Sequence, residues 1–210
     1  MTLKKEVVYE YLKDKIVTLQ YEPGTILNEA DLAEELGVSR TPIRDAMQRL
    51  EGDRLVVIAP RYGAQVPQID FIRMKSLFDL TRVLDAYAAK EACKNAKEED
   101  IEYLKGLIDE MKSYDIKTNY QEAILADEKF HTRIRELVDN SWLDETLRYL
   151  HLHSERLWHY CNSFFESTAI FYKTLGIVVE AFEEKNPEKA ANAAQDHIDE
   201  FVDKIKNTLL

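Results

Sequence analysis

The 210-residue chain has few of the residues that mark disulfide-rich, fibrous or membrane-spanning proteins. Six glycines and five prolines are too few for a collagen-like or low-complexity protein. The two cysteines, Cys93 and Cys161, form no Cys-x-x-Cys motif and no disulfide framework, so we interpret them as reduced thiols. No apolar run approaches the ~20 residues of a membrane-spanning helix, and residues 1–15 lack the apolar stretch of a secretory signal. These absences predict a helix-rich protein of the cytoplasm.

The chain also lacks net positive charge. Its net charge of -11 argues against nucleic acid when taken over the whole chain, because DNA affinity rests on Lys and Arg side chains that neutralise phosphates. The sign reverses within residues 40–61, where every basic residue is an arginine, the side chain best suited to phosphate and guanine. These residues are Arg40, Arg44, Arg49, Arg54 and Arg61. The acidity of the chain therefore does not exclude a DNA-binding segment.

The N-terminal third has the pattern of a winged helix-turn-helix. Apolar residues at helical spacing predict helices over residues 3–19 and 29–36, and Gly37 follows the second as a C-terminal cap. Ser39 or Thr41 then caps a third helix. Two helices joined by a tight glycine-containing turn form a helix-turn-helix, whose second helix is offered to the major groove of DNA.

The third helix has two contrasting faces. Arg40, Arg44 and Gln48 recur at i, i+4 and i+8 on one of them. The inner stripe consists of Ile43, Ala46, Met47 and Leu50. We infer that one face packs and the other reads DNA; the alternative for the arginines is a solvated helix surface. Two short extended runs, 55–58 and 64–66, flank a glycine-containing turn and indicate a wing.

After a linker at residues 67–70 the sequence has no further strand signal. Helices are predicted at about 72–94, 98–114, 119–138, 142–163, 168–184 and 187–208. Short connections between long amphipathic helices imply an antiparallel bundle. We therefore predict a mainly α protein with two domains, a winged helix-turn-helix over 1–68 and an all-helical effector-binding and dimerisation domain over 71–210.

The helix-turn-helix segment resembles the GntR family of transcription regulators. The family pattern Gly-x-x-Leu-x-Glu-x-x-Leu-Ala-x-x-Leu-Gly-Val-Ser-Arg-Thr-Pro-x-Arg-x-Ala-x-x-x-Leu is matched from Gly24 to Leu50. The wing motif Pro-x-x-Gly-x-x-Val is matched from Pro60 to Val66. One departure is Ala30, where relatives often carry an arginine that touches DNA, so one contact is expected to be missing.

This resemblance implies a set of DNA contacts. Arg40 and Arg44 would read bases, and Ser39 and Thr41 would bind phosphates. Gly63 would enter the minor groove, because a glycine lets the backbone approach closely. The full predicted set is Ser39, Arg40, Thr41, Arg44, Gln48, Arg49, Arg61, Tyr62 and Gly63.

The rest of the chain resembles, more loosely, the FCD ligand-binding domain of the FadR-type branch of this family. The segments that carry this resemblance are Arg82-Val-Leu-Asp85, Asp127-Glu-Lys-Phe-His131, Asn140-Ser-Trp-Leu143 and Asn186-Pro-Glu-Lys-Ala190. Independently of any family, Asp127, His131 and His197 lie on inward helix faces, where burial is costly without partners. They are either hydrogen-bonded core residues or members of a functional pocket, and we favour the pocket.

The FCD resemblance implies a divalent metal held by an Asp and a His from one helix and by one His from each of the last two helices. Here one histidine position is Leu175, within an apolar stripe. Asp127, His131 and His197 are left, so a zinc site open to water or ligand is possible but not obligatory.

The resemblance further implies that Arg82 clamps a carboxylate effector, since guanidinium suits that bidentate pairing. Its alternative is a surface salt bridge with Asp85 or Asp79. The remaining histidines are His151, His153 and His159. We interpret them as mostly solvent-facing, although one of them could replace the missing ligand.

Taken together, these patterns predict a repressor whose operator binding is modulated by a small carboxylate metabolite. A homodimer on a near-palindromic duplex is expected, because one recognition helix covers only a half-site. The main alternative is a metal-assisted enzyme using Asp127, His131 and His197, but it leaves the arginine helix without a purpose. Neither a Gly-x-Ser-x-Gly elbow nor a phosphate loop is found. A third alternative is a helical scaffold for protein contacts.

Overall fold

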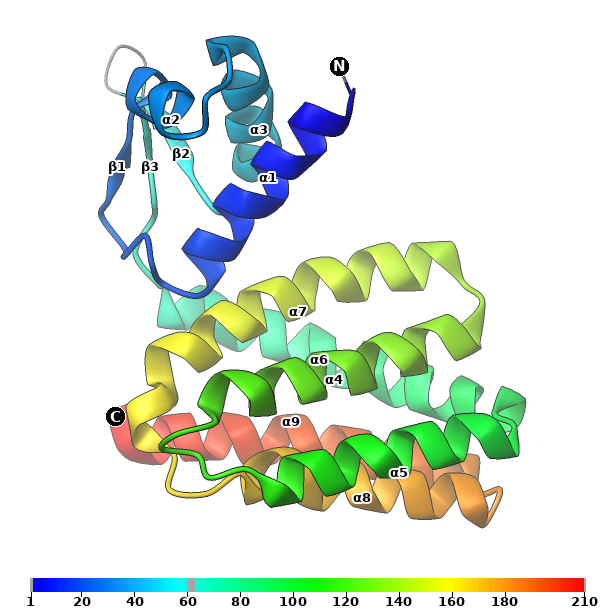
Figure 1. The fold of residues 1–210 in the computed structure, drawn as a ribbon. Coiled ribbons are helices and arrows are strands. Elements are labelled where there is room, and N and C mark those ends of the chain that lie inside the picture. Colours follow the sequence, from blue (N-terminus) through cyan, green and yellow to red (C-terminus); the bar gives the residue numbers. More distant parts are fainter. Residues whose placement is uncertain (1, 60–62, 210) are drawn as a thin grey trace. The chain divides into compact units, whose positions relative to one another are not determined.

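The computed structural model describes residues 2–59 and 63–209, which divide into two compact units. The first, here called the N-terminal unit, comprises Met1–Phe71 and Glu155–Tyr160. The second, the helical unit, comprises Ile72–Ser154 and Cys161–Leu210. Figure 1 shows the elements within each unit.

The N-terminal unit combines three helices with a small sheet. Its elements are α1 (Thr2–Val17), β1 (Ile26–Leu27), α2 (Glu29–Glu35), α3 (Arg40–Gly52), β2 (Val57–Ala59) and β3 (Gly63–Gln65). The strands are antiparallel in the order β1-β3-β2, and Gln65 pairs with both Ile26 and Val57. The sequence pattern does not predict β1, because two residues are too few to show the alternation of a strand.

The predicted inner stripe of α3 forms part of the core of this unit. Ile43 and Leu50 are fully buried, as are Leu12 and Ile16 of α1. Each such side chain contributes about 1.5–3 kcal/mol by leaving water. The packing of α1 on α3 therefore fixes which face of α3 is turned inward, and the arginine face is left outside.

Two glycines allow the turns of this unit. Gly37, with φ +61°, follows the end of α2 in the left-handed conformation, as predicted. Gly63 has φ +98°, and a Cβ atom there would lie 2.5 Å from the carbonyl oxygen of Leu27. The close approach of β3 to β1 thus requires glycine at this position, a reason within the fold that the sequence analysis did not anticipate.

The helical unit is an antiparallel bundle, which confirms the predicted fold class. Its elements are α4 (Phe71–Asn95), α5 (Glu98–Ser113), α6 (Tyr120–Val138), α7 (Ser141–Cys161), the 3-10 turn η1 (Asn162–Phe164), α8 (Ala169–Glu183) and α9 (Pro187–Leu209). Within it α8 packs against α9 and α5, and α5 against α6, as Figure 1 shows. Asn140 caps α7 by accepting a hydrogen bond from the Leu143 amide, and α9 begins at Pro187.

Aromatic side chains fill the bundle. Phe130, Phe171, Phe182 and Phe201 are among its most deeply buried residues. Several polar side chains, among them Asp85, Asp127, Arg135 and His197, are buried in the same interior. In the part of the chain that the structure describes, every helix is too short or too polar to cross a membrane.

Candidate functional site

The predicted reading face of α3 is solvent-exposed. Arg40, Arg44 and Gln48 all lie on the outside, opposite the buried stripe. Ser39 occupies the N-cap position, but its side chain makes no capping hydrogen bond, and Thr41 is likewise exposed. The two hydroxyls at the start of this helix therefore point to solvent, where a phosphate can be bound.

Arg44 is held by a residue that the sequence analysis did not single out. Its Nε lies 3.1 Å from Glu29 Oε1 and its Nη2 lies 2.8 Å from Oε2, a bidentate pair between α3 and α2. The hydrogen bond from Arg44 lowers the pKa of Glu29. Because the pair is exposed, its main effect is to orient the guanidinium plane rather than to stabilise the fold.

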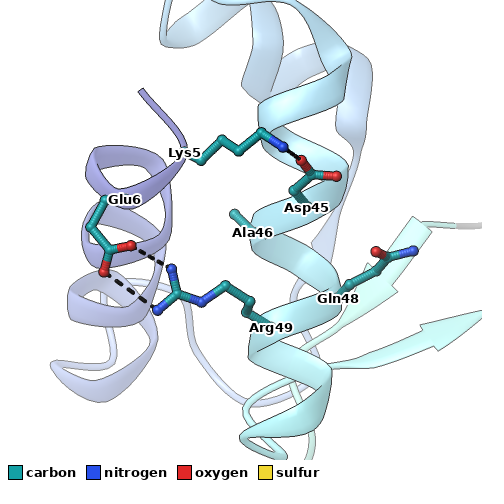
Figure 2. Close-up of a pocket in the computed structure, with 6 residues that line it drawn as sticks. All are labelled: Lys5, Glu6, Asp45, Ala46, Gln48 and Arg49. Atoms are coloured by element: carbon teal, nitrogen blue, oxygen red, sulfur yellow. Dashed lines mark hydrogen bonds and ion pairs between the residues drawn. The ribbon is translucent and has the colours of Figure 1, made fainter. Parts of the chain in front are cut away.

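Arg49, also in the predicted set, is turned toward α1. Its Nη1 lies 2.6 Å from Glu6 Oε2, and its guanidinium lies 3.8 Å from the ring centre of Tyr9. Lys5 and Asp45 form a second ion pair between the same helices. Figure 2 shows both pairs around an open pocket of about 410 Å³, which Ala46 and Gln48 also line. Arg49 therefore connects α3 to α1.

The wing residues are described only in part. Arg61 and Tyr62 lie outside the described residues, and Gly63 begins β3. Any contact that these residues make with DNA stays a prediction.

In the helical unit the structure brings together three of the predicted site residues. His131 Nε2 lies 3.7 Å from Asp127 Oδ2, and His197 Nε2 lies 3.7 Å from Asp127 Oδ1. Asp127 and His131 come from α6 and His197 from α9, and all three side chains are largely buried. The structure therefore brings the three predicted residues together from two helices.

Both histidines of this cluster are neutral at physiological pH. Burial lowers the pKa of His197 to about 4, and burial also holds the pKa of His131 well below its usual range. The Nδ1 atom of His197 lies 2.9 Å from the Thr174 hydroxyl. This contact orients the ring and leaves Nε2 facing Asp127, as in the outer-shell contacts of metal-binding histidines.

The donor set fits a divalent metal. One donor atom from each of Asp127, His131 and His197 lies within 4.8 Å of the others. The 3.7 Å gaps between Asp127 and the two imidazoles can be spanned by ligand bonds of about 2.0–2.2 Å to a shared ion. Leu175 is buried among apolar side chains, so α8 supplies no fourth imidazole from that position. The cluster therefore offers three protein ligands, as open zinc sites do.

A second polar group was missed by the sequence analysis. His151 Nε2 lies 3.0 and 3.1 Å from the two carboxylate oxygens of Asp85. The predicted solvent exposure is wrong for His151, whose side chain is 16% exposed, and for His159, which is buried. Burial alone would raise the pKa of Asp85, but its pairing with His151 lowers it.

Arg135 extends this group. Its Nη1 donates to His151 Nδ1 at 2.8 Å, its Nη2 donates to Thr132 Oγ1 at 2.8 Å, and its Nε faces Asp144 Oδ1 at 3.2 Å. Arg135 lies four residues after His131 in α6, so both are on one helix face. That spacing is the signal from which the sequence analysis could have found it.

The structure does not bring Arg82 into either group. Its Nε lies 2.8 Å from both carboxylate oxygens of Asp199, and the two side chains are 40% and 46% exposed. The alternative of a surface salt bridge is therefore the observed geometry, although the partner is Asp199 rather than Asp85 or Asp79.

Each of the two units matches a known protein family. Residues 4–66 match the family described as "Bacterial regulatory proteins, gntR family", and residues 76–200 match the "FCD domain". The chain belongs to the GntR family of transcription regulators. The FCD match places this GntR regulator in the branch with a helical effector-binding domain.

Curated relatives of this GntR protein are regulators too. The Nta operon transcriptional regulator of Aminobacter aminovorans is 31% identical, over 67% of this chain and 65% of that protein. The uncharacterized HTH-type transcriptional regulator YdhC of Bacillus subtilis is 26% identical, over 96% and 90%. The gluconate operon transcriptional repressor of the same organism is 29% identical, over 65% and 56%. These names give the enzyme alternative no support.

Solved structures share the fold. E. coli McbR/YncC superposes with a TM-score of 0.85 at 20% identity and covers 99% of both chains. A putative GntR regulator from Rhodococcus sp. RHA1 superposes with a TM-score of 0.73 at 20% identity, over the whole of both chains. At this identity the likeness shows that the GntR fold is present and no more.

Proposed function

We propose that this GntR regulator is a repressor that binds a near-palindromic operator as a homodimer, with its affinity modulated by a small carboxylate effector. The observation that carries the proposal is the division of α3, whose apolar stripe is buried while Arg40, Arg44 and Gln48 are exposed. An exposed helix face with arginine side chains and a neighbouring wing suits the major groove. The protein would act in the cytoplasm, where bacterial DNA lies.

A stripe on α4 supports the dimer. Ile72, Leu80, Val83 and Tyr87 are 46–84% exposed. Their spacing of eight, three and four residues places them along one side of the helix. A row of exposed apolar side chains is typical of an interface, and a second copy of the chain is the occupant that a palindromic operator requires.

The proposal can be tested by selecting binding sites from a random duplex DNA library with the purified protein. We expect enrichment of a near-palindrome whose half-sites are separated by about one helical turn, with affinity that falls steeply as salt rises. A competing random duplex should bind far more weakly. Enrichment of no sequence, or of a single half-site without a repeat, would contradict the proposal.

The effector would bind beside the cluster of Asp127, His131 and His197. These three residues would hold a divalent cation such as zinc, which when bound supplies a Lewis-acidic centre for a carboxylate. The two imidazoles contribute neutral lone pairs, and Thr174 keeps the His197 ring in place. Because the set has three ligands rather than four, we regard the metal as an optional bridge rather than an obligatory one.

Zinc retention tests this cluster directly. After incubation with Zn²⁺ and dialysis, we expect one zinc ion per wild-type chain and less than a tenth of that in His131→Ala and His197→Ala, since each loses a strong donor. Elemental analysis with circular dichroism as a folding check measures both. His153→Ala, a histidine outside the cluster, is the matched control. Equal zinc in all four proteins would place the ion elsewhere.

A further inference from the structure

The helical unit contains a buried cation close to the proposed effector site. We propose that Arg135, and not Arg82, receives an anionic group of the effector, so that the site selects acids with two anionic ends. This inference rests on the proposed function, in which an acid binds beside Asp127, His131 and His197. A second anionic end on the acid would be bound by Arg135.

Burial distinguishes the two arginines. The side chain of Arg135 is 5% exposed, and burial lowers its pKa despite the opposing charge of Asp144. Arg82 is half open to water and already forms a bidentate pair with Asp199. An anion gains more from a cation that water does not screen, so Arg135 is the stronger attractor.

The charge of Arg135 is only partly compensated by its carboxylate partner. Asp144 Oδ1 faces Arg135 Nε at 3.2 Å, while Asp144 Oδ2 lies 2.6 Å from Arg148 Nη2. One carboxylate thus serves two guanidinium groups, and the closer contact goes to the exposed Arg148. Asp85 adds a second negative charge nearby, but it accepts from His151, so Asp144 is the carboxylate that the guanidinium itself contacts. An effector carboxylate would add a direct charged partner.

The terminal nitrogens of Arg135 are directed at neutral acceptors. Nη1 donates to the His151 ring and Nη2 to the Thr132 hydroxyl, each at 2.8 Å. The guanidinium already makes both bonds charge-assisted, and a carboxylate acceptor would add the attraction of an opposite charge in a poorly screened interior. An effector carboxylate can therefore replace the Thr132 hydroxyl, or the ring, with a net gain.

The same contact fixes the chemistry of His151. Because a guanidinium only donates, His151 Nδ1 accepts, and its proton lies on Nε2, where it is donated to Asp85. A metal on Nε2 would require a proton on Nδ1, against the Arg135 donor. Asp85, His131 and His151 lie close enough to hold an ion, but this arrangement disfavours a metal on His151.

The interior therefore has two halves of opposite preference. Asp127, His131 and His197 present lone pairs to a cation, whereas Arg135 presents N–H groups to an anion. The His131 ring stands between the halves, with its centre 4.7 Å from that of His151 and 5.4 Å from that of His197. Because a single histidine ring separates the halves, we expect a short aliphatic dicarboxylate to place one end on each half.

Calorimetry with succinate and butyrate, acids of equal chain length, tests the inference on the zinc-loaded full chain. We expect wild-type protein to bind succinate at least tenfold more tightly than butyrate. Arg135→Met should remove this preference and Arg135→Lys should retain part of it. Arg82→Met is the matched control and should keep the wild-type ratio. The wild-type comparison stands even if an Arg135 variant fails to fold.

The outcomes separate this inference from the proposed function. Equal affinities of wild type for the two acids, or a succinate preference lost in Arg82→Met and kept in Arg135→Met, would overturn the role of Arg135 and leave the acid effector standing. Failure of wild type to bind any aliphatic acid of three to six carbons, with one or two carboxylates, would overturn the proposed acid effector and this inference with it.

Discussion

Arg44→Ala should weaken binding to the selected operator about ten- to hundredfold, and Arg40→Ala should do the same, because each change removes a base or phosphate contact. Both side chains are exposed, so the fold should be unaffected. The expected loss is larger for operator than for random DNA if these arginines read bases. Fluorescence anisotropy with both duplexes at a fixed salt concentration measures this difference.

The control for the arginine variants is Arg148→Ala, which removes an exposed arginine of α7 in the helical unit. It changes the net charge by the same amount without touching α3, so operator affinity should stay within about twofold of wild type. If Arg40→Ala and Arg44→Ala also bind the operator like wild type, α3 is not the recognition helix, and the proposed mode of DNA binding is wrong.

Val83→Arg should convert the dimer to monomers, with a dissociation constant raised at least a hundredfold. Val83 lies in the middle of the exposed apolar stripe of α4, between Leu80 and Tyr87. In a two-fold interface the same patch occurs on both copies, so one substitution places a charge in each and removes the apolar contact. Sedimentation equilibrium should show the mass fall from about twice 24.5 kDa to a single chain.

Leu125→Arg on α6 is the matched control for the interface. Leu125 is, like Val83, an exposed aliphatic residue, but it lies outside the stripe. It should leave the mass at the dimer value. A monomeric wild type at micromolar concentration, with and without DNA, would contradict the dimer. A Val83→Arg protein that remains dimeric would instead move the interface to another face.

Local sequence pattern was sufficient for most of the secondary structure and for the sidedness of α3. Helices repeat every 3.6 residues, so an apolar stripe and its opposite polar face can be read directly from spacing. The predicted break between residues 138 and 142 is reproduced because the capping signal, Asn140, lies within a few residues of the helix end. Strand β1 escaped prediction because its two residues acquire strand geometry only by pairing with β3, almost forty positions away.

In the candidate site, too, local spacing predicted some features and tertiary packing decided the others. The sequence by itself determined that Asp127 and His131 share an inward face, because both lie four residues apart on one helix. Only the tertiary structure decided that Asp85 pairs with His151 rather than with Arg82, that Arg82 pairs with Asp199, and that Arg135 is buried. The reason is physical: helical spacing fixes the direction of a side chain, whereas its partner is set by the packing of residues 66 or 117 positions apart.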